Sequence, residues 1–367
     1  MNTGVWMSRV LYGEQSWNPL ARTVELTEER LRVGRRTTPL EELHLAAMAE
    51  AFQRGVWLGG GGAERPLHRL PDGPGIVPVT RVTGTTRPVK SRQAAAFAHR
   101  LGELAVGRCG GPAQVAALGE RARAEGVPLW IARRVAPGPA GPVTVAVDRG
   151  LVRVDVWGPQ APAVRLRAPG GYDARDQSPS KGLLATVGGT RAQLVLKDRK
   201  RRSKRRVELQ IPGRHWVLTR ENSVTSLLRC NERPVALLSR PPYSRPAPGP
   251  GSLLLPLTPV RLDGGDALDA VMAQFFAVSF GIGDTTGSAR FRSRRPRPAS
   301  VGPGGEPLAA DQDWDRPWFT NLGSGAEDNE PGGGDGWGSD GGDGGSGGDS
   351  GGGDSGGGDG GGGGGGD

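Results

Sequence analysis

The sequence has few of the residue types on which most enzymes build their chemistry. Its 367 residues include two cysteines and four histidines. It contains no CxxC, HExxH, GxSxG or Walker sequence. Cys109 and Cys230 are too few for a disulfide framework, and both lie among small or apolar residues, so we expect reduced thiols. These absences argue against the familiar hydrolase, redox and zinc sites.

The residues that could hold a metal or move a proton do not gather in the sequence. His44, His68, His99 and His215 are scattered along the chain. Glu41 and His44 have the spacing used in di-iron bundles, which need two copies, and only one is present. A pair on a helix surface is the simpler interpretation. We expect no metal, no cofactor and no catalytic residue, and the alternative is an enzyme with an unrecognised site.

Long apolar runs are missing at the start of the chain, and lysine is rare throughout. The opening "MNTGVWMSRVLYGEQSWN" has no run of signal-peptide length, so a cytoplasmic protein is expected. Of the 47 basic residues, five are Lys and the rest are Arg. Together with abundant Ala, Gly and Pro, this bias is typical of a GC-rich genome, such as that of an actinobacterium. Part of the basic charge therefore reflects composition rather than binding.

Charge is divided unevenly along the chain. Residues 300–367 carry fourteen acidic residues and one base, Arg316, so that residues 1–299 hold a net charge of +22 within an overall +9. From Pro331 to Asp367, 24 of 37 residues are Gly. A segment of this composition cannot offset its ordering entropy. We expect residues 290–367 to form a disordered tail, first basic and then acidic, with a possible contact to the basic body.

Residues 1–126 predict a small mixed α+β unit. Residues 22–34, "RTVELTEERLRVG", alternate like a hairpin, whereas residues 38–58 carry apolar side chains at helical spacing and end at "GGGG". The stretch "IVPVTRV" is typical of a strand. Two further helices are predicted from Ser91 to about Gly107 and from Pro112 to about Glu125, each with a favourable start and a terminal Gly.

From Val127 the pattern changes to about eleven short runs with alternating polarity, separated by Gly, Pro, Asn or Asp. Such spacing is typical of antiparallel β structure. We therefore expect residues 127–289 to form an antiparallel β-barrel or sandwich. It contains one helix near its C-terminal end, predicted over residues 266–283, within "GDALDAVMAQFFAVSFGIGD".

This helix has no polar face. Asp266 is a good N-cap, and twelve of the sixteen residues 267–282 are apolar. Asp269, Gln274 and Ser279 lie about 140° apart in turn around the helix axis. At about 25 Å the helix is shorter than the ~30 Å hydrocarbon core, so we expect it inside the β structure, with a membrane span as the alternative. The side chains expected to be inaccessible to water are Phe275, Phe276, Val278 and Phe280.

About eleven strands followed by one apolar helix resemble the family of tubby C-terminal domains, phospholipid scramblases and LURP-one-related proteins. The resemblance covers about residues 127–284. It rests on element order, the Phe-rich helix and strands such as "HWVLTRENSVTSLLRCNERPVALLSR". It implies a closed barrel threaded by the helix. It also implies an intracellular protein that binds lipid surfaces or partners. No functional residue is carried over. A plain sandwich and a pleckstrin-homology-like module are the alternatives.

A basic run, "KDRKRRSKRR", lies between two strand-like segments and so predicts a hairpin tip. It holds three of the five lysines, which codon bias does not explain. Each base near an anionic membrane contributes about 1 kcal/mol, but the same run could neutralise nucleic-acid phosphates, or form only a solvated hairpin. No RNP-like or helix-turn-helix signature favours sequence-specific readout. The predicted anion-binding residues are Lys197, Arg199, Lys200, Arg201, Arg202, Lys204, Arg205 and Arg206.

The tail contains two further motifs. "RFRSRRPRP", residues 290–298, is either a linker or a second contact for the same anionic partner. "DQDWDRPWF" places Trp314, Trp318 and Phe319 among acids, which is typical of a docking motif for another protein or for the basic body.

Two loops resemble ligand-binding motifs but lack features that those motifs require. Asp311, Asp313 and Asp315 have the spacing of a calcium loop, but the Gly at its sixth position and the Glu at its twelfth are missing. "GIGDTTG", residues 281–287, looks like a phosphate loop but follows a helix instead of a strand. We expect neither ligand.

The sequence therefore predicts an α+β protein: a mixed N-terminal unit, an antiparallel barrel or sandwich with a buried helix, and a disordered tail. Its predicted function is non-enzymatic binding of an anionic surface, lipid headgroups, through the basic hairpin, with modulation by the acidic tail. Such a protein would be cytoplasmic and peripheral to a membrane. A non-sequence-specific nucleic-acid binder is the main alternative.

Overall fold

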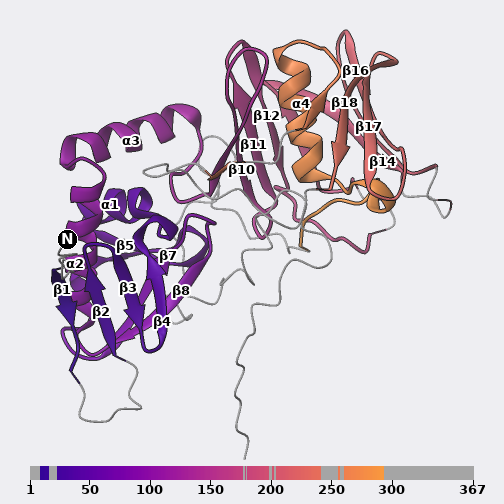
Figure 1. Ribbon diagram of the computed structural model, residues 1–367. Helices are drawn as coiled ribbons and strands as arrows, with labels where there is room; N and C mark the ends of the chain where they lie inside the picture. Colours follow the sequence, from indigo (N-terminus) through magenta and orange to yellow (C-terminus); the bar gives the residue numbers. More distant parts are fainter. Residues whose placement is uncertain are drawn as a thin grey trace, which may run out of the picture.

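The structure is a computed structural model of the chain, drawn in Figure 1. It describes residues 9–15, 23–176, 178, 180–197, 201, 204–240, 255–256 and 260–292. Helices and antiparallel sheets together confirm the predicted α+β class. The predicted tail lies outside the described residues, apart from its first three positions.

A four-stranded antiparallel sheet opens the N-terminal unit. The predicted hairpin over residues 22–34 is confirmed, because its two strands pair from Val24↔Val33 to Leu26↔Leu31. Val24 and Leu26 are fully buried and Glu25 between them is half-buried, as the alternation predicts, whereas Thr27 at the end of the strand is also buried. The strands, in their order across the sheet, are β1 Val10–Gly13, β2 Val24–Thr27, β3 Arg30–Val33 and β4 Arg36–Pro39.

The helix predicted over residues 38–58 is wrong in extent, since α1 covers only Leu45–Gln53. Leu40 and Leu43 are buried, but they reach the core from a short 3-10 turn and the extended residue after it. His44 then caps α1 by accepting the backbone N–H of Ala47 at 3.4 Å. The apolar residues of a strand, a 3-10 turn and a helix follow one another here at the spacing of a single longer helix, which is why the prediction was too long.

The other two predicted helices are confirmed within a few residues, as α2 Ala94–Arg108 and α3 Pro112–Glu125. The predicted strand "IVPVTRV" falls largely within β7, which pairs with β8. The remaining elements of the unit are η1 Leu40–Glu42, β5 Val56–Leu58, η2 Gly60–Gly62, β6 Glu64–Pro66, η3 Leu67–Arg69, β7 Gly75–Thr80 and β8 Thr86–Ser91.

Ten consecutive strands, β9 to β18, form one antiparallel meander, and two short strands extend it to twelve. β19 pairs with β9 at one edge and β20 pairs with β18 at the other. Only four residues lie between Pro256 and Arg261, so the two edges are held close together and the sheet curls on itself. Figure 1 shows β10, β11 and β12 on one side of the helix α4 and β16, β17 and β18 on the other.

The strands of this larger sheet correspond to the short alternating runs of the sequence. They are β9 Arg133–Ala136, β10 Val143–Asp148, β11 Arg153–Gly158, β12 Ala161–Arg167, β13 Leu184–Val187, β14 Thr190–Lys197, β15 Arg206–Ile211, β16 Arg214–Arg220, β17 Thr225–Cys230, β18 Arg233–Ser239, β19 Leu255–Pro256 and β20 Arg261–Leu262.

The helix α4, Ala267–Ser279, fills the curled sheet. It packs against β10, β11 and β12 and, across the interior, against β18. Every residue from Asp269 to Ser279 is buried, and Phe275, Phe276, Val278 and Phe280 are fully inaccessible to water, as predicted. The rings of Phe275 and Phe276 meet edge to face at 5.8 Å. Within the described residues, no helix combines the length and the apolar character that crossing a membrane requires.

The helix ends earlier than predicted. It stops at Ser279, because Phe280 is extended and forms a bridge with Ala289. The turn that follows brings Gly281 so close to Thr285 that a Cβ at position 281 would collide with the carbonyl oxygen of Thr285. Phe280 and Ile282 are still apolar, but the chain reverses direction at Gly281 and Gly283 instead of continuing as a helix.

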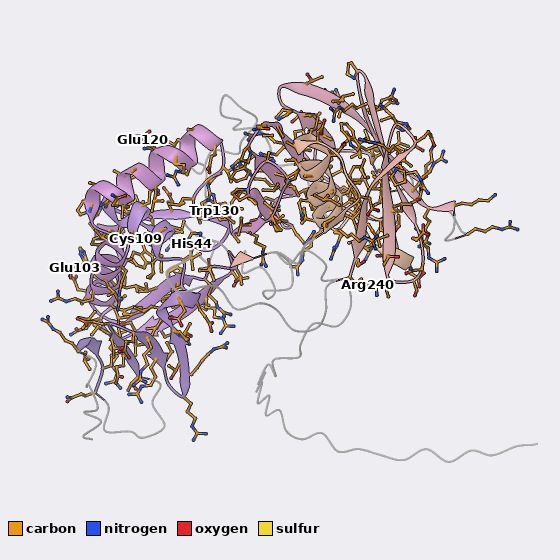
Figure 2. The ribbon with its side chains drawn as sticks, turned by 45° about the horizontal axis from the view of Figure 1, so that its top comes forward. His44, Glu103, Cys109, Glu120, Trp130 and Arg240 are labelled. Carbon is orange, nitrogen blue, oxygen red and sulfur yellow. The ribbon has the colours of Figure 1, made fainter. Side chains whose placement is uncertain are left out.

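The apolar residues form two large cores, one within residues 12–115 and one within residues 136–291. Trp130 lies on the segment that joins them. It packs against two small apolar clusters, one of Ala47, Ala51 and Leu58 and the other of Val127, Ile131 and Ala146. Figure 2 shows it between the N-terminal unit and the larger sheet.

Three arginines of the larger sheet hold the C-terminal end of α3. Arg165, Arg153 and Arg133 donate to the carbonyl oxygens of Glu125, Gly126 and Val127 at 2.8, 2.6 and 2.6 Å. Cations at a helix C-terminus complement its dipole. Asp155, only 1% exposed, holds the Arg cluster in place by accepting from Arg153, Arg165 and Arg167 at 3.0, 3.2 and 2.6 Å. We call Arg153, Asp155, Arg165 and Arg167 the junction cluster.

Candidate anion-binding surface

One end of the larger sheet gathers the loops around the predicted basic hairpin. They are the turn 149–152, the loop 168–183, the loop 198–205 and the turn 221–224, and the C-terminus of α4 lies among them. The chain then crosses the same end between Phe280 and Arg292. We call this the basic end. Its exposed bases among the described residues are Arg175, Lys181, Arg201, Lys204, Arg206, Arg240 and Arg292.

The predicted hairpin is confirmed, since β14 and β15 pair antiparallel up to Lys197↔Arg206. These two bases share one carboxylate: Glu208 Oε1 lies 2.8 Å from Lys197 Nζ and 2.5 Å from Arg206 Nε. Burial opposes ionisation of Glu208, but the hydrogen bond from Lys197 and the charges of Arg206 and Lys197 outweigh it and lower its pKa. The base of the hairpin is thus partly neutralised within the fold.

Arg205 serves the fold at the next position. It donates to the carbonyl oxygen of Asp284 at 3.2 Å, and Arg220 pairs with the Asp284 carboxylate at 2.7 Å. Asp284 belongs to the glycine-rich loop 281–287, whose backbone is also engaged. The N–H of Gly283 donates to Ser226 Oγ at 2.8 Å. This loop closes the end of the sheet.

The carbonyl oxygens at the end of α4 accept from two more arginines. Arg149 donates to Val278 at 2.8 Å, and Arg290 donates to Ala277 at 3.2 Å. Both cations stand where the helix dipole is negative. Arg149 is almost fully buried, so its charge stabilises the fold instead of facing solvent.

The remaining bases of the basic end project from its loops. Arg201 and Lys204 belong to one turn, in which the Lys204 N–H donates to the Arg201 carbonyl oxygen at 2.9 Å. Lys181 is exposed and pairs with Asp176 at 3.2 Å. Arg240 follows β18 and is labelled in Figure 2 at this end of the sheet.

An exposed apolar side chain stands beside these bases. Val224 is 48% exposed, and Val10, at 55%, is the other exposed large apolar residue among those described. Asn222 Oδ1 accepts the N–H groups of Val224 and Thr225, both at 2.9 Å, which fixes the turn. The N–H of Arg240 donates to the Val224 carbonyl oxygen at 3.1 Å, so an Arg lies next to the apolar tip.

The opposite end of the same sheet has a different charge balance. Asp266 caps α4 there, and the hydrogen bond from Arg214 lowers its pKa to about 2. Glu232 and Asp263 are exposed at this end as well. The exposed Arg191, Arg233 and Arg261 lie at the same end, and Arg214 pairs with Asp266, so the bases there balance these acids. The exposed bases of the basic end outnumber its exposed acids, Asp173 and Glu221, so the sheet is electrostatically asymmetric along the axis of α4 and its positive pole is the basic end.

Several predicted binding residues lie outside the described residues. They are Arg199, Lys200 and Arg202 of the hairpin loop, Trp314, Trp318 and Phe319 of the docking motif, and residues 293–298 of the second basic cluster. The described part of that cluster is divided: Arg290 contacts the end of α4 and Arg292 is exposed.

The candidate metal and catalytic residues do not come together. Glu41 and His44 do not form a pair on a helix surface, because Glu41 lies on η1 and His44 is buried at the start of α1. Burial, followed by the charge of Arg133, lowers the pKa of His44 to about 4. Within the described ranges, no group of three or more His, Cys, Asp or Glu side chains could hold a metal ion. Cys109 and Cys230 are free thiols, and burial raises the pKa of each.

Two features of the basic end were not predicted from the sequence. Val224 sits in a turn, where no periodicity marks it. Arg175, Lys181 and Arg240 lie far from the basic run in the sequence, and only the strand order brings them to the same end.

Comparison of the chain with models of protein families, with curated proteins and with solved structures finds no match.

Proposed function

We propose that the protein binds anionic lipid surfaces through its basic end. The observation that carries the proposal is that exposed bases from separate loops and one exposed apolar side chain, Val224, lie at the same end of the sheet. Lys197, Arg205 and Arg206 contribute mainly by fixing the hairpin, because each already contacts Glu208 or Asp284. Arg201, Lys204 and Arg240 are then the bases best placed to meet headgroups.

The electrostatic contribution is large enough to matter. Each Lys or Arg near an anionic leaflet contributes about 1 kcal/mol, and the effect fades within a Debye length, about 10 Å at 0.1 M salt. Three to seven exposed bases at one end therefore contribute about 3–7 kcal/mol, which corresponds to dissociation constants from the millimolar range down to about 10 µM. Affinity should fall steeply as salt is added.

The surroundings of the bases favour lipid over nucleic acid. Val224 offers an apolar tip that could enter the headgroup region, where burial of apolar area stabilises binding. Binding of single-stranded nucleic acid relies on exposed aromatic rings that stack with bases. The described aromatics near this end, Tyr172 and Phe291, are buried and contact each other edge to face at 6.3 Å.

The resemblance to the tubby and scramblase family supports the same proposal. A curled twelve-stranded sheet around an all-round buried helix agrees with the architecture that the resemblance implies. We propose on this basis a cytoplasmic, non-enzymatic protein that attaches reversibly to a membrane surface.

The test is flotation with phosphatidylcholine vesicles, with and without phosphatidylserine, beside a gel-shift assay with duplex DNA and RNA at the same salt. The test variant is R201S/K204S/R240S. The control R30S/R36S/R121S removes the same charge from exposed positions on β3, β4 and α3 of the N-terminal unit.

The proposal predicts that the protein floats only with anionic vesicles, and that the test variant loses this binding while the control keeps it. Equal losses in both triple variants would mean that net charge, not the basic end, governs binding. Binding to DNA or RNA but not to vesicles would establish the alternative function and overturn this one.

A further inference from the structure

We infer that the acidic segment 300–367 docks on the basic end and competes there with anionic lipid. The inference rests on the proposed function, because it names the regulation of the same surface. After α4 the chain runs back across the basic end, where the N–H of Arg290 donates to the Ser279 carbonyl oxygen at 3.0 Å and the N–H of Arg292 donates to the Arg149 carbonyl oxygen at 3.4 Å.

The segment that follows is thus tethered at the positive pole of the sheet. Residues 300–367 carry fourteen acidic residues against one base, Arg316. The first acid, Glu306, comes fourteen residues after Arg292, and a chain of that length spans at most about 50 Å. The acids can therefore reach the basic end without any rearrangement of the sheet.

Tethering makes weak contacts effective. A segment bound to the same molecule acts at an effective concentration in the millimolar range when its tether is short enough to reach the site. The opposite end of the sheet attracts it less, because the exposed Glu232, Asp263 and Asp266 there balance the exposed Arg191, Arg233 and Arg261. The acids are spread along the chain, so the contact is diffuse and sensitive to salt.

The first experiment compares the full-length protein with a full-length variant in which all fourteen acids of residues 300–367 are Asn or Gln. Vesicle binding is measured at low and moderate salt. The inference predicts that the neutralised variant binds anionic vesicles severalfold more tightly at low salt, and that the difference shrinks as salt rises. Equal affinity of the two proteins at low salt would overturn it.

The second experiment reads the contact itself and does not depend on lipid. Carbodiimide joins a lysine amine to a carboxylate only where the two meet. Lys181 and Lys204 report on the basic end, and Lys90, exposed on β8 of the N-terminal unit, is the internal control. We expect cross-links from the tail acids to Lys181 and Lys204 in preference to Lys90, lost at 0.5 M salt.

Cross-links to Lys90 at the same frequency, or none to Lys181 and Lys204, would refute the docking. If neither protein binds vesicles but these cross-links form, the proposed function fails and the tail contact stands. If both proteins bind vesicles equally and no selective cross-link forms, the function stands and the tail contact fails.

Discussion

The indole Nε1 of Trp216 donates a hydrogen bond of 2.9 Å to Oδ1 of Asp269, and both residues are buried inside the curled sheet. Asp269 also completes a capping box with Asp266 at the start of α4. One carboxylate thus joins the helix terminus to β16, and it explains why an acid is found on the otherwise apolar helix α4. A capping carboxylate near a helix N-terminus is further favoured by the helix dipole.

Replacing Asp269 with Ala should therefore destabilise the fold by about 3 kcal/mol, because it leaves the Trp216 N–H buried without this acceptor and removes a cap. Trp216→Phe should cost less, about 1–2 kcal/mol, since Asp269 keeps its backbone partner. Urea denaturation measures both. Equal and negligible changes would show that the pair does not anchor the helix.

Asp155 is predicted to be essential to the junction cluster. Asp155→Asn leaves the guanidinium groups of Arg153, Arg165 and Arg167 without a full counter-charge, and breaking a buried pair in this way costs about 3–5 kcal/mol. Asp263→Asn, at an exposed carboxylate, is the matched control. Thermal unfolding of the two variants should differ by many degrees, and similar melting temperatures would contradict the role assigned to the cluster.

Acid should weaken the N-terminal unit through His44. Its folded-state pKa of about 4 lies below the ordinary value of 6.5, so the unfolded state binds more protons between these pH values. Stability is complete above pH 6.5 and falls as the pH drops toward 4, by at most about 3 kcal/mol. His44→Asn retains a capping side chain and should flatten this dependence in urea titrations, whereas exposed His68→Asn should leave it intact.

The aromatic core around α4 is predicted to be filled. Phe276 is fully buried and contacts the rings of Phe275 and Phe280 at 5.8 and 5.7 Å. Phe276→Ala should lower the free energy of unfolding by about 3–5 kcal/mol, from lost burial and the cavity that remains. Phe276→Leu, which keeps most of the volume, is the control. A loss below about 1 kcal/mol for the Ala variant would mean that the helix is loosely packed.

The burial of α4 could be predicted from the sequence, because the distribution of polar side chains around a helix depends only on local residue order. Three polar residues scattered around twelve apolar ones leave no face for water, so the helix had to lie inside other structure. The end of the helix could not be predicted in the same way. Phe280 is as apolar as the residues before it, and the reversal depends on close contacts of Gly281 with Thr285 and of Gly283 with the distant Ser223.

The junction cluster was invisible for a different reason. Along β11 and β12, Arg153, Asp155, Arg165 and Arg167 alternate with apolar residues, a pattern that predicts a solvated face. The end of α3 covers that face, which turns exposed charges into buried partners. The basic hairpin could be predicted from its run of bases. The wider basic end could not, because the order of strands brings its other loops together.

The most direct test of the proposed function places a polarity-sensitive fluorophore at Val224. In a Cys109→Ser background, Val224→Cys and Val10→Cys would each be labelled, since these are the two exposed large apolar positions among the described residues. Cys230 is buried and burial raises its pKa to about 11, so it should label poorly. With phosphatidylserine vesicles, the label at 224 should shift to the blue and be quenched by brominated lipid, while the label at 10 should not change. The same response at both positions, or none at 224 under conditions where the protein floats with the vesicles, would contradict binding through the basic end.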